Sequence, residues 1–266
     1  MISGFDHVVI AVRDLAAGVA AYETLLGRSA QTPAQDDGAA RAVIATDNTA
    51  VELMAPIGQG EAARRLHAAL DDGGEGLKSL VFAVDDIERA HRRCERVGLA
   101  PQPLQSGAAG RSFRADTACT HGVRLFFMQR AAPPTPSPAG DAAAAALDHI
   151  VIRTADPERA AALYGARLGL DMRLDREVAG RRLMFFRCGD AIVEIAQDPA
   201  LGARDRVWGL SWRVTDADTA RARLAAAGVN VSDVRAGKKP GTRVFTVRDK
   251  SCGVPTLMIE PSLKRD

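Results

Sequence analysis

Hydrophobic and polar positions along the chain follow one pattern that occurs four times. An apolar stretch is followed by an aspartate, then by apolar residues at helical spacing, and then by a glycine. The aspartates are Asp14, Asp86, Asp156 and Asp216, and the glycines, 12 or 13 positions later, are Gly27, Gly98, Gly169 and Gly228. An aspartate before a helix accepts hydrogen bonds from free backbone amides, and a glycine adopts the left-handed conformation that ends a helix. The pattern therefore predicts four modules that each begin with a strand and a helix.

Short apolar runs separated by turn residues follow each glycine, as is typical of strands joined by hairpins. In the third module these runs are DMRLDREV, RRLMFFRC and AIVEIAQ. Each module is thus predicted to be βαβββ. A four-stranded sheet with one helix leaves a face and an edge uncovered, so modules are expected to pair side by side. The predicted fold class is α+β, with four βαβββ modules paired into two cup-shaped, eight-stranded domains.

The two halves of the chain repeat each other. Residues 7–15 read HVVIAVRDL, and residues 149–157, which begin 142 positions later, read HIVIRTADP. The same offset relates Glu52 in AVELMAP to Glu194 in IVEIAQD, so each histidine precedes its glutamate by 45 positions. A repeat that keeps both residue type and spacing indicates a tandem duplication.

Residues 131–146 differ in composition from the rest, with four prolines followed by an alanine tract. Proline-rich chain is extended and does not join a sheet, so this segment is predicted to be a linker. The predicted domains are residues 1–130, with modules of about 4–57 and 76–130, and residues 147–266, with modules of about 147–198 and 205–262.

The charge is nearly balanced, with 35 basic and 33 acidic residues and a net charge of +2. This balance argues against nucleic acid or a membrane surface as a partner. The chain has no apolar run of the roughly 18 residues that a membrane span needs, and its first residues lack the features of a signal peptide. We expect a cytoplasmic monomer or homodimer whose partner is a small-molecule ligand or substrate. The four cysteines have no metal-binding spacing and are expected to be reduced thiols.

The chain resembles the vicinal-oxygen-chelate superfamily of glyoxalase-like proteins. The segments that carry the resemblance are GFDHVVIAVRDLAAGVAAYETLLGR with VELMAP, LKSLVFAVDDIERAHRRCERVGL with HGVRLFF, LDHIVIRTADPERAAALYGARLGL with VEIAQ, and LSWRVTDADTARARLAAAGV with GVPTLMIEP. They cover both halves apart from the linker. Members of this superfamily include glyoxalase I, methylmalonyl-CoA epimerase, extradiol dioxygenases and metal-free antibiotic-binding proteins, so the resemblance is specific for fold and weak for function.

The resemblance implies a divalent metal (Fe, Mn, Ni, Zn or Co) in each cup, held by the first and last strands of both paired modules, and no nucleotide cofactor. Such a metal is suited to imidazole and carboxylate ligands, with open positions for two substrate oxygens. His7 and Glu52 match the ligand positions of module one, and His149 and Glu194 match those of module three. In the even modules these positions hold Ser79, Phe126, Gly209 and Leu257.

Each cup therefore has two of the usual ligands if modules pair as one with two and three with four. The nearby candidates are His121, Asp116 and Cys119 in the first half and Glu260 in the second, but Glu260 lies an odd number of positions from the ligand register and is expected on the opposite strand face. If modules one and three instead faced each other, His7, Glu52, His149 and Glu194 would form a two-His, two-Glu set of the glyoxalase type.

The same residues also have ordinary structural interpretations. A histidine in an apolar strand is often a hydrogen-bonded core residue, and a glutamate there needs a partner. Trp208 and Trp212 share a strand face and are candidate substrate-binding residues, or are core aromatics. Lys238 and Arg243, in the basic segment 235–249, would suit an anionic or thioester substrate, or belong to a solvated hairpin.

Two hypotheses for function follow. The first is an enzyme, a metal-assisted lyase, isomerase or dioxygenase acting on a small oxygenated acid or thioester, with Glu194 and Glu52 as catalytic residues. The second is a metal-free protein that binds or sequesters a small molecule, which the missing even-module ligands favour. In a third interpretation one domain is a scaffold, and the tryptophans and the basic segment place the working site in the C-terminal domain.

Overall fold

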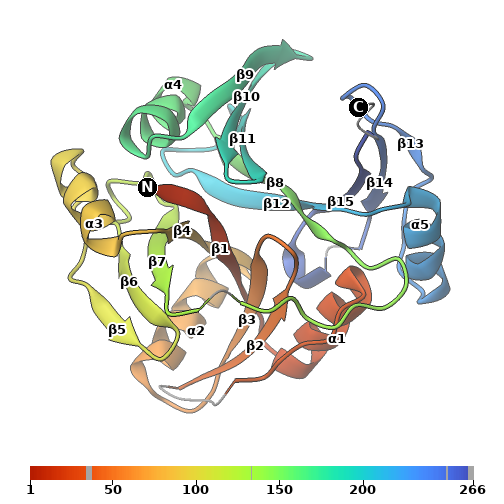
Figure 1. Ribbon diagram of the computed structural model, residues 1–266, viewed down its shortest axis with the longest axis horizontal. Helices are drawn as coiled ribbons and strands as arrows, with labels where there is room; N and C mark the ends of the chain where they lie inside the picture. The colour runs from red at the N-terminus through yellow and green to blue at the C-terminus, as the bar shows by residue number, and fades with distance from the viewer. Residues whose placement is uncertain (34–37, 133, 250, 263–266) are drawn as a thin grey trace. The chain divides into compact units, whose positions relative to one another are not determined.

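The computed structural model describes residues 1–33, 38–132, 134–249 and 251–262 (Figure 1). The helices are α1 (Leu15–Leu26), α2 (Glu61–Gly73), α3 (Ile87–Arg96), α4 (Pro157–Ala161) and α5 (Ala217–Ala226), with a π-helical turn η1 (Ala162–Arg167) and a 3-10 turn η2 (Ser251–Gly253). The strands are β1 (Ile2–Ala11), β2 (Ala39–Ala45), β3 (Ala50–Pro56), β4 (Gly76–Val84), β5 (Gln105–Gly107), β6 (Gly110–Arg114), β7 (Arg124–Arg130), β8 (Ala146–Thr154), β9 (Asp171–Val178), β10 (Arg181–Cys188), β11 (Ala191–Gln197), β12 (Arg206–Arg213), β13 (Arg235–Ala236), β14 (Arg243–Val247) and β15 (Thr256–Glu260).

The strands of the described residues form two mixed sheets. One has the order β2-β3-β1-β4-β7-β6-β5 and the other β13-β14-β15-β12-β8-β11-β10-β9. The first sheet contains the strands of modules one and two, and the second those of modules three and four. The predicted α+β class and the pairing of neighbouring modules in one sheet are therefore confirmed.

The first sheet has seven described strands where eight were predicted. After the glycine that ends α1, the described residues before β2 make two isolated bridges: Arg28 pairs with Ala139, and Gln31 and Val43 exchange backbone hydrogen bonds of 2.7 and 2.8 Å. Pro33 lies two positions further on, and proline cannot donate to a strand ladder. The polar, proline-containing sequence thus explains why residues 28–33 form no longer strand at this edge.

All four aspartates cap helices as predicted. The carboxylates of Asp14, Asp86, Asp156 and Asp216 accept hydrogen bonds from the amides of Ala17, Arg89, Arg159 and Thr219 at 3.1, 2.8, 3.0 and 2.7 Å. The first turn of a helix has free amides, and each carboxylate satisfies one of them. Each cap therefore fixes the residue at which its helix begins after the preceding strand.

The helix α2 was not among the predicted elements, because it lies between the first two modules. Its buried residues Leu66 and Leu70 pack against Ala11 and Ala39, with Met54 partly buried beside them. Figure 1 shows α2 beside β3. This packing gives the inserted helix an apolar face of its own.

The chain forms two compact units that do not follow the tandem repeat. The first consists of residues 1–8, 78–134 and 149–208, and the second of residues 9–77, 135–148 and 209–266. Within the first, the stacked rings of Phe5 and Phe82, and of Phe113 and Phe127, form part of the core. The predicted domain boundaries remain a prediction, because these units divide the chain at other positions.

Part of the predicted linker packs within the second unit. Arg28, which is buried, donates from Nε to the carbonyl of Ala144 at 2.7 Å and from Nη1 to that of Ser137 at 3.0 Å. Its Nη2 lies 3.1 Å from a carboxylate oxygen of Asp47. One buried guanidinium therefore satisfies backbone carbonyls of a segment whose described residues before β8 form only the isolated bridge of Ala139 with Arg28.

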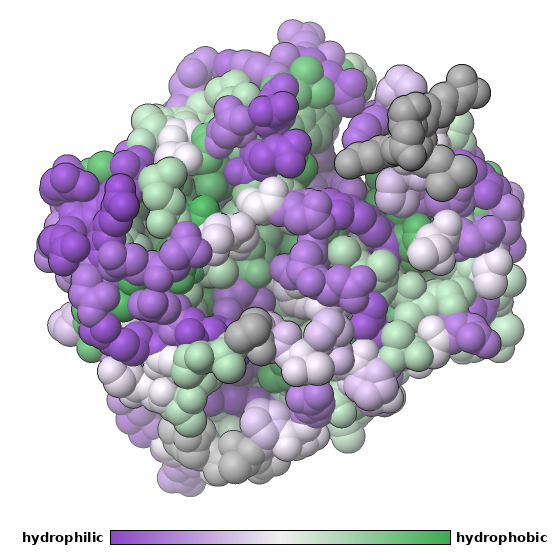
Figure 2. All heavy atoms as spheres, in the orientation of Figure 1, coloured by the Kyte–Doolittle hydropathy of each residue, from purple (hydrophilic) through white to green (hydrophobic). Residues whose placement is uncertain are grey.

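No helix of the described residues is long and apolar enough to span a membrane. On the face of the molecule drawn in Figure 2, hydrophilic and hydrophobic residues alternate.

Candidate active site

His149 and Glu194 lie side by side on one face of the second sheet. Strands β8 and β11 are parallel, with His149 opposite Ile192 and Glu194 opposite Val151. Because side chains alternate along a strand, this register places both polar groups on the same face. His149 Nε2 is 3.5 Å from Glu194 Oε2, and their side chains are 16% and 17% exposed. The structure thus brings together the two predicted residues of module three as a partly accessible imidazole–carboxylate pair.

The neighbouring strands add apolar surface and an arginine to this face. Phe185 on β10 lies opposite Glu194, and it also lies opposite Leu174 on β9. Leu174 is 44% exposed, although it is apolar. The guanidinium of Arg176 stands 5.7 Å from the centre of the Phe185 ring. The carboxylate is therefore flanked by apolar side chains and by a cation that can contact an anion.

A second arginine lies on the same face of β8. Arg153 is four positions from His149, and its guanidinium stands 5.4 Å from the centre of the Trp208 ring. It also forms an ion pair with the buried carboxylate of Asp198. Trp208 is 44% exposed, so it offers surface to a ligand, whereas Trp212 is fully buried and offers none. Of the two predicted tryptophans, Trp208 alone is placed where a small molecule can reach it.

In module one, His7 is oriented by the buried carboxylate of Asp6. His7 Nδ1 is 2.5 Å from Asp6 Oδ1, and Arg130 donates to both carboxylate oxygens at 2.6 and 2.8 Å. Burial alone would raise the pKa of Asp6, but the hydrogen bonds from His7 and Arg130 outweigh it and lower that pKa below its ordinary value. Asp6 thus stays ionised and holds the Nδ1 side of the imidazole.

The other predicted residue of module one, Glu52, lies in the second compact unit on the β2–β3 hairpin. It is opposite Val43, and its carboxylate oxygen is 3.9 Å from Arg41 Nε. The side chain is 20% exposed. Glu52 therefore has a basic neighbour within its own hairpin.

The even-module positions lack strong metal ligands. Ser79 is buried opposite Arg124, Phe126 lies opposite Val81, and Leu257 lies between Ser211 and Thr246. At Gly209 a Cβ atom would stand 2.9 Å from the carbonyl oxygen of Pro255, so the register leaves no room for a side chain there.

Across the described residues, no group of three or more His, Cys, Asp or Glu side chains could hold a metal ion. His149 and Glu194 are chemically suitable ligands, but a protein site for a divalent metal ordinarily needs three or four. The residues present therefore do not fit a tightly held metal, and no chemical step is derived through one.

The two basic candidates of the fourth module are placed differently. Arg243 Nη1 is 3.1 Å from Glu260, whose carboxylate also accepts from the amide of Ala217 at 2.8 Å. A hydrogen bond with Asp218 and these charges raise the pKa of Arg243 above its ordinary value. Lys238 is exposed in the turn between β13 and β14. Glu260 thus has a structural partner at the start of α5, and contact of Arg243 or Lys238 with a substrate stays a prediction.

All four cysteines are free thiols. Burial raises the pKa of Cys94 to about 12, and burial also raises that of Cys252, to about 11. Both are therefore thiols rather than nucleophilic thiolates near neutral pH.

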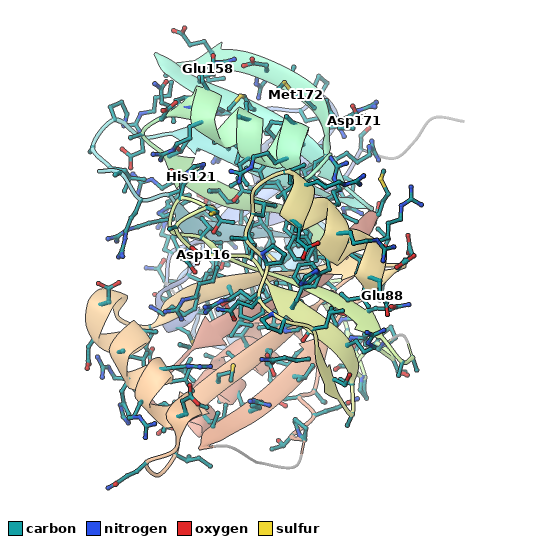
Figure 3. The ribbon with its side chains drawn as sticks, turned by 90° about the vertical axis from the view of Figure 1, so that its left-hand side faces the viewer. Glu88, Asp116, His121, Glu158, Asp171 and Met172 are labelled. Atoms are coloured by element: carbon teal, nitrogen blue, oxygen red, sulfur yellow. The ribbon has the colours of Figure 1, made fainter. Side chains whose placement is uncertain are left out.

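Sequence patterns did not single out Arg153, Arg176 or Asp198. They lie within the segments HIVIRTADP, DMRLDREV and IVEIAQD, but the repeat does not mark these positions, and their placement follows only from strand register. The same applies to His121 and Asp116, which were considered only as substitute ligands and which lie on one loop of the structure (Figure 3).

Two family models match almost the whole chain. Residues 5–143 match the glyoxalase-like domain, and residues 146–255 match the glyoxalase/bleomycin resistance protein/dioxygenase superfamily. The chain therefore belongs to this superfamily and carries two of its domains in tandem.

A curated relative is the ethylmalonyl-CoA/methylmalonyl-CoA epimerase of Cereibacter sphaeroides, which is 33% identical over 100 residues, 37% of this chain and 73% of that protein. Among solved structures, a mutant of 4-hydroxymandelate synthase from Streptomyces coelicolor has a TM-score of 0.76 at 13% identity and covers 100% of this chain and 94% of its own. The Mn(II)-bound glyoxalase from Novosphingobium aromaticivorans has a TM-score of 0.70 at 14% identity, and the match covers 97% of this chain and 82% of that protein. These structural similarities establish the fold.

Proposed function

We propose that the C-terminal half is a proton-transferring enzyme of the lyase or isomerase kind, acting next to the carbonyl group of a small oxygenated acid or thioester. The observation that carries this proposal is the pair of His149 and Glu194, 3.5 Å apart on a partly accessible sheet face. A carboxylate beside an imidazole can remove a proton from carbon and return it, which is general acid–base chemistry.

In the proposed reaction each residue of the pair has one role. Glu194 accepts the proton from the carbon next to the carbonyl, and the electron pair moves onto the carbonyl oxygen. His149 donates a hydrogen bond to that oxygen and stabilises the developing negative charge. The proton then returns from Glu194 to the same face of that carbon, or to the adjacent carbon of an enediolate, as an isomerase requires. No oxidant or reductant is required.

The surroundings favour an anionic substrate with an apolar part. Arg153 and Arg176 supply positive charge, while Leu174, Phe185 and Trp208 supply apolar surface. Guanidinium groups recognise carboxylates and phosphates through paired hydrogen bonds. The similarity to an epimerase of CoA thioesters supports a thioester as the first substrate class to test.

The test is exchange of the carbon-bound proton for deuterium. The protein is incubated in D₂O with a panel of acyl-CoA thioesters and 2-oxo acids, and loss of the proton signal is followed by NMR. We expect Glu194→Gln and His149→Asn each to slow the exchange by about 100-fold or more, because each removes a group that acts in the proton transfer.

The matched control is Glu177→Gln. Glu177 is an exposed carboxylate on β9 whose neighbour in sequence, Arg176, occupies the site face, so Glu177 points to the other side. The Glu177→Gln protein should catalyse deuterium exchange at the rate of the wild type. Equal loss of exchange in this control would contradict the assigned roles.

The second candidate function is binding without chemistry. The exposed apolar side chains Leu174 and Trp208, together with Gly209 and Leu257 at ligand positions, favour it. Saturable binding by calorimetry, with no deuterium exchange in any substrate of the panel, would replace the enzymatic proposal with this one.

A further inference from the structure

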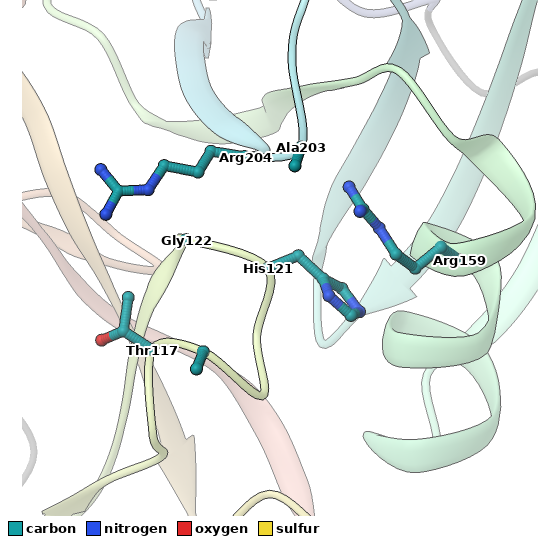
Figure 4. Close-up of a pocket in the computed structure, with 7 residues that line it drawn as sticks. Thr117, His121, Gly122, Arg159, Ala203 and Arg204 are labelled. Carbon is teal, nitrogen blue, oxygen red and sulfur yellow. The ribbon is translucent and has the colours of Figure 1, made fainter.

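A pocket lies within the first compact unit and uses none of the residues of the proposed active site. Its volume is about 430 Å³, and its lining residues are Thr117, Ala118, His121, Gly122, Arg159, Ala203 and Arg204 (Figure 4). They come from the loop between β6 and β7, from α4 and from the loop between β11 and β12. Pockets of this size accommodate a small organic molecule.

The pocket wall is basic. Arg159 is held in place by the buried carboxylate of Asp205, whose Oδ1 accepts from Arg159 Nη2 at 2.7 Å and from Thr154 Oγ1 at 2.7 Å. Arg204 is exposed, and within the described part of the chain it has no ion-pair partner. One carboxylate therefore balances one of the two guanidinium groups, and a positive charge remains at the pocket.

His121 adds a ring nitrogen to this wall. Its backbone has φ 57°, in the left-handed region that residues other than glycine rarely adopt. Burial and the positive charge of Arg159 lower the pKa of His121 below its ordinary value. Asp205, Arg167 and Asp156 are the other charged groups near it. An unprotonated ring there can take up a proton when negative charge enters the pocket.

Within the described residues, buried polar atoms of the Arg159–Asp205 pair at the pocket lack hydrogen-bond partners. These atoms are Arg159 Nε and Asp205 Oδ2, which are inaccessible to solvent. Leaving such atoms unsatisfied costs free energy, so their clustering marks a place where polar groups are missing.

We propose that this pocket is a binding site for the oxyanion end of a small organic molecule, a phosphate or a carboxylate. Arg204 forms the ion pair, Arg159 forms a second charge-assisted hydrogen bond, and the Thr117 hydroxyl and the His121 ring complete the contacts. Guanidinium groups fixed by a carboxylate bind oxyanions because their geometry is set before the ligand arrives.

The first measurement is a titration of the full-length protein with inorganic phosphate, and separately with acetate and citrate, at constant ionic strength kept with potassium chloride. Binding is followed by calorimetry and by the ring-proton NMR signal of His121. The expected result is saturable binding of at least one oxyanion and a rise in the pKa of His121 on binding. The phosphate and carboxylate arms then identify which group the site prefers.

Variants test whether the basic wall carries the binding. Arg204→Gln should weaken it by about tenfold or more, since one charge-assisted contact is lost. Arg206→Gln removes the same charge from an exposed residue two positions away that does not line the pocket, and it should bind as the wild type does. His121→Gln, which keeps a polar side chain, should abolish the pH dependence of acetate binding near neutral pH, where acetate itself does not titrate.

Two outcomes would overturn the proposal. One is the absence of saturable binding of phosphate, acetate and citrate by the wild-type protein. The other is equal weakening by Arg204→Gln and Arg206→Gln, which would show a general charge effect. Neither result depends on whether deuterium exchange occurs at Glu194.

Discussion

At the scale of single residues, the repeat preserves more than its two histidines and two glutamates. The offset that pairs His7 with His149 and Glu52 with Glu194 also pairs Asp6 with Asp148, the residues that precede the two histidines. An arginine binds each aspartate: Arg130 donates to Asp6, and Arg213 Nε donates to Asp148 at 3.0 Å. Equivalent positions in the repeat therefore have related polar neighbours.

Asp6 is the residue whose replacement should affect stability most directly. Asp6→Asn leaves Arg130 without its buried carboxylate, so we expect a loss of about 3 kcal/mol in the free energy of unfolding at pH 7. The folded-state pKa of Asp6 is lowered, so its stabilisation is present above the unfolded pKa of about 3.9 and is lost as pH falls through the lower folded value. Urea unfolding at several pH values measures both effects.

Asp72→Asn, in an exposed position of α2, is the matched control and should change the free energy of unfolding little at any pH. The difference in the free energy of unfolding between the wild type and Asp6→Asn should become smaller below about pH 4. A difference that stays constant down to pH 2 would show that the hydrogen bonds of Asp6 are not what stabilises the fold.

At the scale of elements, the sequence predicted most of the secondary structure because the signals are local. Each aspartate caps a helix through a hydrogen bond within three residues, and each hairpin follows from short apolar runs. Two features were missed. The helix α2 lies outside the repeat, and within the described residues the strand expected after α1 is reduced to isolated bridges at Arg28 and Gln31, near a proline. The pocket at His121 could not be predicted, because its walls come from three separate segments.

Asp86 provides a direct test of a helix cap. Asp86→Ala removes the acceptor for the Arg89 amide, so we expect a loss of about 1 kcal/mol in the free energy of unfolding. Asp86→Asn keeps an acceptor oxygen and should cost much less. Chemical denaturation monitored by circular dichroism measures the change.

The neighbouring Asp85→Ala serves as the comparison for this cap. Asp85 is largely exposed and its carboxylate is not the cap acceptor, so its removal should change stability little. If Asp85→Ala and Asp86→Ala lowered the free energy of unfolding by similar amounts, local charge, rather than the cap hydrogen bond, would be what stabilises α3.

On the scale of the whole molecule, the two halves have the same departure from the superfamily's metal site. Odd modules keep a histidine and a glutamate, and even modules have serine, phenylalanine, glycine and leucine at the matching positions. The repeated segments were enough to predict the family and the fold. The number of candidate metal ligands that lie close together depends instead on which modules pair. Sequence alone left both pairings open, and the strand order of the two sheets decides between them.

Metal content tests this conclusion. We expect plasma mass spectrometry to find well under one divalent metal per chain, both as purified and after incubation with manganese, iron, nickel, zinc or cobalt, because two donors hold such ions weakly. Treatment with EDTA should leave the midpoint of thermal unfolding unchanged. Stoichiometric metal that is lost in His149→Ala would contradict this, and its loss in both His7→Ala and His149→Ala would indicate a shared four-residue set.

The division of the chain into interleaved compact units also has a consequence for synthesis on the ribosome. The second unit begins at residue 9 but needs residues 209–266 to be complete. At roughly 5–20 residues per second, its first segment waits on the order of ten seconds or more for its last one. During that time the apolar surface of the nascent first segment is exposed to other newly made chains. Synonymous changes that slow translation between residues 78 and 208 therefore lengthen this exposure without altering the protein that results.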